Sequence, residues 1–114
     1  MLDKADAELK RLGRIAQDEP DVASLRGRIF LAREDWEAVV ELCDSCRSRF
    51  PWIADFYIQQ ALALAKLERL EEARSTWLAA PREIRATAFY HYNLARCELR
   101  LGHLSLARQH LQSA

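Results

Sequence analysis

The chain has 114 residues, of which half are apolar and 30% are charged, and it contains only three glycines and three prolines. This composition is typical of a mostly helical protein of one domain. Lys and Arg together number 17, as do Asp and Glu, so the formal net charge is zero and the basic excess usual for nucleic-acid binding is missing.

The same sequence argues against a membrane protein. The apolar run from Phe56 to Ala65 is too short to cross a bilayer, and the N-terminal stretch MLDKADAELKRL is too charged for a signal peptide. An odd number of cysteines, three, favours reduced thiols. We therefore expect a cytoplasmic protein that binds neither nucleic acid nor membranes.

Apolar residues at helical spacing predict seven helices and no strands. The first covers residues 3–17, where Leu2, Leu9, Leu12 and Ile15 share one face. Asp35 is the expected N-cap of the third helix, and Gly102 is expected to end the sixth. The other six helices are expected at 21–33, 36–49, 53–67, from Leu70 to about Ala80, from a start between Pro81 and Ala86 to Leu101, and at 104–113.

One spacing of 34 residues recurs along these helices. It links small or compact residues at Ala5, Val39, Ala73 and Ala107, and again at Gly27, Ala61 and Ala95. It also links larger ones, at Leu2, Trp36, Leu70 and Leu104 and at Leu9, Cys43, Trp77 and Leu111. Small residues where helix axes approach, with large apolar ones nearby, predict helix pairs that stack on one another.

This pattern resembles the tetratricopeptide repeat (TPR) family, whose unit is about 34 residues long. The last copy is the clearest, with Leu94, Ala95, Gly102, Leu104, Ala107, Leu111 and Ala114. Four positions depart from the family pattern: Arg26 and Gln60 stand where it prefers Leu, Glu98 replaces an aromatic residue, and Pro81 comes a few residues early. The resemblance implies an all-α fold, a right-handed α-superhelix (solenoid) of about three helix pairs plus an N-terminal orphan helix. The single domain 1–114 would contain repeats at about 20–53, 54–87 and 88–114.

Both ends of the chain are unusual for a solenoid, because it starts in the middle of one repeat and stops a turn before the last helix should finish. A capping helix normally covers the final repeat. Here no later segment covers the apolar residues of helix 104–113, which are Leu104, Leu106 and Leu111. We expect either a fragment of a longer array or a chain that associates with itself as a homo-oligomer.

Cysteine and histidine residues suggest chemistry only weakly. Cys43 and Cys46 have a C-x-x-C spacing that could indicate a redox or metal site, but both fall late in a predicted helix at core positions. Cys97 also falls at an inward position. The sequence shows no nucleophile motif and no glycine-rich phosphate loop. His91, His103 and His110 occupy unrelated positions without carboxylates at matching spacing, so we expect no metal, no cofactor and no enzyme activity.

The remaining candidate is a surface. In TPR proteins the first helix of each unit lines a concave groove that usually holds peptides. The positions carried over from the family are Ser24, Arg28, Leu31, Ile58, Gln59, Leu62, Lys66, Phe89, Tyr92, Asn93, Arg96, Leu99 and Arg100. An apolar floor below Arg and Lys suits a peptide with hydrophobic anchors and a carboxylate, although these cations could simply solvate the face.

The resemblance therefore implies a non-catalytic protein–protein interaction module, an adaptor that binds a peptide or helix segment in its groove. Of the residues that clamp a C-terminal carboxylate in co-chaperones of this family, only Asn93 matches, so heat-shock chaperone tails are not the expected ligand. The alternatives are a self-associating scaffold fragment of a longer TPR array and, as a third reading, a thiol or metal site at Cys43 and Cys46.

Overall fold

The computed structural model describes residues 4, 7–8, 10–11, 14 and 19–114, and every regular element within them is a helix. Most of the predicted orphan helix 3–17, including its apolar face, lies outside the described residues. The helices are α2 (Pro20–Ala32), α3 (Trp36–Arg49), α4 (Ala54–Lys66), α5 (Leu70–Ala79), α6 (Arg82–Arg85), α7 (Ala88–Arg100) and α8 (Leu104–Ser113). None of these helices is long and apolar enough to cross a membrane.

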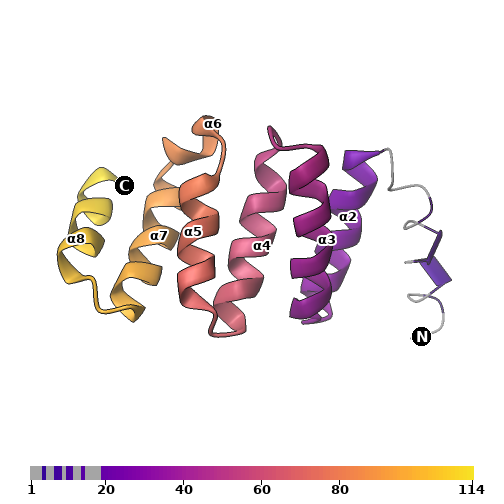
Figure 1. The fold of residues 1–114 in the computed structure, drawn as a ribbon, viewed down its shortest axis with the longest axis horizontal. Coiled ribbons are helices and arrows are strands. Elements are labelled where there is room, and N and C mark those ends of the chain that lie inside the picture. Colours follow the sequence, from indigo (N-terminus) through magenta and orange to yellow (C-terminus); the bar gives the residue numbers. More distant parts are fainter. Residues whose placement is uncertain (1–3, 5–6, 9, 12–13, 15–18) are drawn as a thin grey trace.

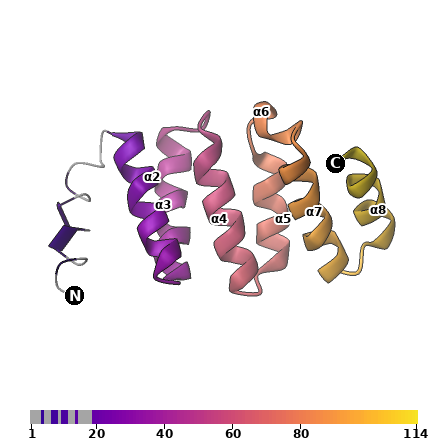
Figure 2. The same cartoon turned by 180° about the vertical axis from the view of Figure 1, so that it is seen from behind.

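The helices stand side by side in a row and form three antiparallel pairs, α2 with α3, α4 with α5, and α7 with α8 (Figure 1). The second helices of the first two pairs also pack on the following pair, α3 on α4 and α5 on α7. The reverse view shows α2, α4 and α7 together on one face, with α3 and α5 behind them (Figure 2). The resulting shape is elongated, 46 × 26 × 19 Å. The predicted all-α solenoid of stacked helix pairs is confirmed.

The first helix of each pair ends in the same turn. Glu34, Glu68 and Gly102 have φ values of 58°, 62° and 83°, and they lie 34 residues apart. In each turn the next residue donates its N–H to the carbonyl five positions back, over 2.9, 2.9 and 2.7 Å, which is the Schellman arrangement. Gly102 thus ends α7 as predicted. Asp35 occupies the predicted N-cap of α3, although its side chain makes no capping hydrogen bond.

Residues at the repeated small positions are buried where helices meet, as their spacing predicts; Ala61, Ala73 and Ala95 have no exposed surface. At the equivalent position in α2, a Cβ added to Gly27 would stand 1.8 Å from Gln59 Oε1. Gln59 is itself only 2% exposed. Its Nε2 donates to the Ser24 carbonyl over 3.1 Å and to Asp55 Oδ2 over 3.0 Å. Gly27 therefore leaves room for a buried amide that joins α2 to α4.

The helix predicted to begin between Pro81 and Ala86 begins later, and that prediction is wrong. Arg82–Arg85 forms the separate one-turn helix α6, and α7 starts at Ala88. Thr87 causes the break: its hydroxyl accepts the Tyr90 N–H over 3.1 Å and donates to the Ile84 carbonyl over 2.7 Å. A side chain that caps a new helix in this way ends the preceding turn.

Candidate functional site

A pronounced hollow in the structure lies where the three helix pairs meet. We call it the groove pocket; its volume is about 380 Å³, within the range of ligand-binding pockets. Apolar side chains from α2, α3, α4 and α5 line it together with cationic ones from α4 and α7. The lining residues are Leu31, Trp36, Ala61, Leu62, Ala65, Lys66, Trp77, Asn93, Arg96, Cys97 and Arg100.

The predicted groove residues divide between this pocket and its surroundings. Those that line it are Leu31, Leu62, Lys66, Asn93, Arg96 and Arg100. Tyr92 and Leu99 lie outside the lining and are exposed on α7, while Ile58 is half-buried on α4. Gln59 is buried against Gly27 and makes no part of the open surface. Arg28 is exposed on α2 and pairs with Asp55 at 3.7 Å.

The groove positions carried over from the TPR family do not include Trp36 and Trp77, the two tryptophans that line the groove pocket. Both belong to second helices, at positions that the 34-residue spacing predicts to pack between helix pairs. Trp77 is only 1% exposed; its ring makes edge contacts with Phe89 and Tyr90 of α7, each at 6.0 Å between centroids. The 34-residue spacing aligns Trp36 with Leu104 and Trp77 with Leu111, and so predicts a large apolar side chain at each position. It does not predict that these side chains border the groove.

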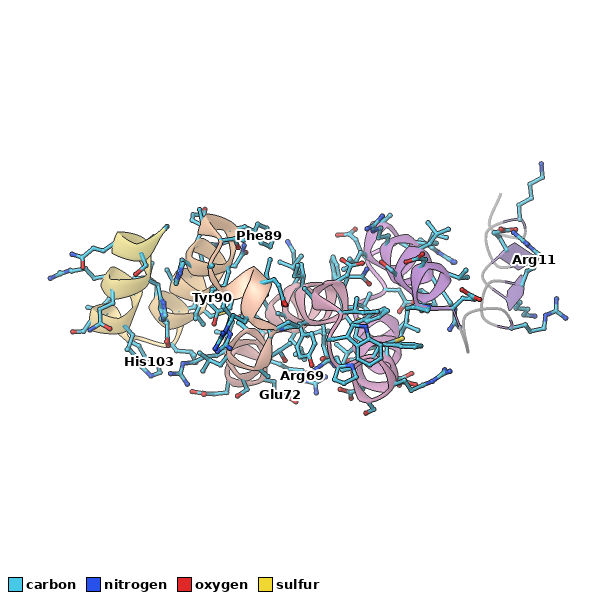
Figure 3. The ribbon with its side chains drawn as sticks, turned by 90° about the horizontal axis from the view of Figure 1, so that it is seen from above. Arg11, Arg69, Glu72, Phe89, Tyr90 and His103 are labelled. Carbon is cyan, nitrogen blue, oxygen red and sulfur yellow. The ribbon has the colours of Figure 1, made fainter. Side chains whose placement is uncertain are left out.

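The opposite face of the solenoid carries polar side chains, several of which pair with one another. Figure 3 shows Phe89 on one side of the row of helices and Arg69 and Glu72 on the other. Arg69 Nε donates to Glu72 Oε2 over 2.6 Å. The buried Gln60 donates to Asp44 Oδ1 and accepts from Arg47, both over 2.7 Å. This face therefore offers less apolar surface for a ligand than the groove does.

The three cysteines are buried, as their core positions predict. Cys43 has no exposed surface. Burial, reinforced by the neighbouring Cys46, raises the pKa of the Cys43 thiol, and burial likewise raises the pKa of Cys46. Reactive and metal-binding cysteines need a thiolate and so have a lowered pKa. The C-x-x-C spacing therefore reflects helix packing and does not support a redox or metal site.

The histidines do not lie at unrelated places as the sequence suggested, and that reading is corrected. His103 Nδ1 is 2.7 Å from Glu98 Oε1, and His110 Nε2 is 3.8 Å from Glu98 Oε2. The His91 ring stacks on that of His110 at 5.8 Å, and Arg74 Nε donates to Glu98 over 2.8 Å. This polar cluster joins α5, α7 and α8. It forms around Glu98, the carboxylate that stands where the family pattern has an aromatic residue.

Electrostatics makes the Glu98 cluster sensitive to acid. Burial alone would raise the pKa of Glu98, but hydrogen bonds from His103 and Arg74 outweigh it and the pKa is lowered. Ionised Glu98 thus stabilises the fold above its unfolded pKa of about 4.3, and this is lost as the pH falls through the lower folded value. Burial lowers the pKa of His110, so below about pH 6.5 the unfolded chain takes up a proton more readily and stability falls.

The three leucines of α8, which we call the terminal face, are exposed. Leu104, Leu106 and Leu111 show 64%, 37% and 49% of their surface. In the preceding pairs, the residues at the repeat position of Leu111 are Cys43 and Trp77, which are 0% and 1% exposed. A following helix buries each of those two residues, since α3 packs on α4 and α5 on α7. Leu111 therefore stands at a position that is covered elsewhere in the same molecule, whereas the counterparts of Leu104, which are Trp36 and Leu70, are half-buried.

The geometry defines a class of protein, an α-helical solenoid of stacked helix pairs with a groove along its first helices. No protein-family model matches the chain, and no curated protein matches it. Solved structures of MamA, a TPR-like protein, do share its fold. MamA from AMB-1 aligns with a TM-score of 0.81 at 22% identity, over 95% of this chain and 61% of MamA. MamA from MSR-1 gives a TM-score of 0.78 at 22% identity, over 95% and 64%. The chain thus spans less than two thirds of these MamA chains, and at this identity the likeness concerns the fold.

Proposed function

We propose that this chain is a non-catalytic interaction module, an adaptor or scaffold element that holds a peptide or helical segment of a partner protein in its concave groove. The observation that carries the proposal is the groove pocket, with a volume of about 380 Å³ between three helix pairs. Apolar pockets with a few polar groups at their edge are the usual form of a binding site. A stack of helices that presents such a pocket can receive side chains from a docked segment.

The chemistry of the site favours binding over catalysis. The side chains that line the groove pocket are apolar or cationic apart from Asn93 and Cys97. Asn93 Nδ2 donates to the Phe89 carbonyl over 2.8 Å, and burial raises the pKa of the Cys97 thiol. Neither is therefore activated as a nucleophile. This chemistry supports the proposal of an adaptor, and its cytoplasmic location is proposed from the sequence alone.

Peptide selection tests this function directly. A random peptide display library is selected on the wild-type protein, and the enriched peptides are then measured against two variants. Ala65→Arg fills the groove pocket, because Ala65 lines it. Ala79→Arg is the matched control, since Ala79 is an exposed helical alanine of α5 that is not among the lining residues. Circular dichroism and thermal melting establish that both variants fold.

The proposal predicts peptides that bind the wild type and Ala79→Arg with similar affinity and that lose at least tenfold in affinity for Ala65→Arg. A library from which no peptide is enriched, or peptides that bind all three proteins equally, would refute the groove as the docking site.

Self-association is a second candidate function, and the exposure of the terminal face favours it. Burying an exposed leucine contributes roughly 1.5–3 kcal/mol, so covering Leu104 and Leu111 by a second copy would stabilise a dimer. In this reading the chain works as a scaffold whose copies join through Leu104, Leu106 and Leu111.

Sedimentation equilibrium over a wide concentration range measures this association. Dimers or larger oligomers are expected for the wild type and for Leu78→Glu, a change at another exposed leucine of a second helix. Leu104→Glu with Leu111→Glu should shift the population to monomer. A wild-type protein that remains strictly monomeric at high micromolar concentration would rule out the scaffold.

A further inference from the structure

The cations of the groove fall into two groups according to their partners. Arg28 faces Asp55 at 3.7 Å and Arg100 pairs with Glu68, so each already has a carboxylate. Lys66 and Arg96 instead lie near aromatic faces: Lys66 Nζ is 5.9 Å from the centre of the Trp36 ring, and Arg96 Cζ is 5.8 Å from that of Tyr92. Within residues 19–114, no ion pair is formed by either of these two side chains.

Contact with an aromatic ring positions a cation without neutralising it. A cation–π contact at an exposed site is weak, whereas a charge-assisted hydrogen bond to a carboxylate is among the stronger polar contacts. Lys66 and Arg96 are both exposed. The rings of Trp36 and Tyr92 therefore hold two positive charges beside the groove that are still available to an anionic partner.

The two available cations border the same pocket. Lys66 and Arg96 line the groove pocket together with Trp36, Trp77 and Leu62, and none of its lining residues is acidic. An apolar side chain can enter this pocket, whereas a cationic one would meet uncompensated positive charge. A ligand that complements both the apolar interior of the pocket and the cations at its edge therefore carries an apolar side chain close to a negative charge.

We propose that the groove selects a peptide segment in which an apolar side chain, preferably aromatic, enters the pocket lined by Trp36 and Trp77, while an Asp or Glu within four positions of it pairs with Lys66 and Arg96. This inference rests on the proposed peptide-binding function and adds the chemistry of the partner. At the other end of the groove, Asp55 faces Arg28 and accepts hydrogen bonds from Ser24 and Gln59. The cation there already has a carboxylate, so that end does not select an acidic residue in the peptide. The acidic residue of the peptide is therefore expected to bind at the end formed by α4 and α7.

A protein partner fits these charges better than a nucleic acid does. A single strand brings a continuous row of phosphates and needs a basic track along its path. The formal net charge of this chain is zero, and the other two groove cations are paired with carboxylates. Two available cations beside one apolar pocket match one or two carboxylates of a peptide.

Charge reversal of the two cations tests the inference. Peptides are selected in parallel on the wild type, on Lys66→Glu/Arg96→Glu, and on the matched control Arg82→Glu/Arg108→Glu, which reverses two exposed arginines of α6 and α8. The selected peptides are sequenced, and their affinities are measured by fluorescence anisotropy at low and high salt. A nine-residue oligo(dT) strand serves as a competitor.

The inference predicts that wild-type and control selections enrich Asp or Glu within four positions of an apolar, mainly aromatic, residue. Peptides from the groove-reversed variant should enrich Lys or Arg instead, and wild-type peptides should lose at least tenfold in affinity for it. Peptides that depend on the groove pocket, as judged by Ala65→Arg, but show no acidic preference would overturn this inference and leave the proposed function standing. This inference would also be overturned if the oligo(dT) strand displaced the peptide with an affinity equal to that of the peptide. If no selected peptide depends on the groove pocket, both the inference and the proposed function are refuted.

Discussion

Gly27→Ala places a methyl group where the Gln59 amide now lies, and it tests how α2 packs on α4. An added Cβ would stand 1.8 Å from Gln59 Oε1, so the buried amide must move. Overpacking of this kind costs about 1–3 kcal/mol, and the two hydrogen bonds of Gln59 contribute about 1 kcal/mol each. Alanine has a higher helix propensity than glycine, which stabilises α2 by about 1 kcal/mol. The free energy of unfolding should therefore fall by about 2–4 kcal/mol.

A double-mutant cycle measured by urea denaturation separates these contributions. In a Gln59→Ala background the amide is gone, so Gly27→Ala should now raise the free energy of unfolding by about 1 kcal/mol through helix propensity alone. The change of sign is the decisive result. If the two substitutions simply add, within about 0.5 kcal/mol, the amide does not occupy this space and the described contact between α2 and α4 is wrong.

Three further predictions concern the turns, the core and the Glu98 cluster. Gly102→Ala should lower the free energy of unfolding by about 1 kcal/mol, and Glu34→Gly should raise it by a similar amount, since both positions have positive φ; equal signs in urea titrations would contradict this. Ala73→Asp should cost several kcal/mol by burying an unpaired charge, whereas Ala79→Asp, on the exposed side of α5, should change stability by less than about 0.5 kcal/mol; similar melting temperatures would refute the assignment. Between pH 7 and 5 the wild type should lose stability more steeply than His110→Gln, because the pKa of His110 is lowered in the fold; parallel pH profiles would argue against it.

The fold could be predicted because a solenoid repeats the same packing contact between neighbouring helices along the chain. The 34-residue spacing of Ala61 with Ala95 places small residues where helices cross, and both residues are fully buried. Gly102 could be predicted because a left-handed residue after a helix favours glycine. Glu34 and Glu68 adopt the same conformation without that signal, so their turns follow from the repeat and not from the local sequence.

The contacts between side chains of different elements could not be read from the sequence. Glu98 meets His103, His110 and Arg74 because three helices converge on it, and no single-helix spacing encodes that meeting. Gln59 was expected on the groove surface, yet the absent side chain of Gly27 lets it turn inward. The groove pocket depends on Trp36 and Trp77, which come from second helices and which a rule about first helices does not include.

Chemical-shift mapping of the tryptophan indole N–H signals tests the central claim, peptide docking in the groove, most directly. Trp36 and Trp77 line the groove pocket, whereas Trp52 is 68% exposed and lies against Phe50, outside the lining. On titration with a display-selected peptide, the signal of Trp36 should shift in proportion to binding, with a smaller shift for Trp77, while that of Trp52 stays in place. Binding that moves Trp52 and leaves Trp36 and Trp77 unchanged would contradict the groove as the site.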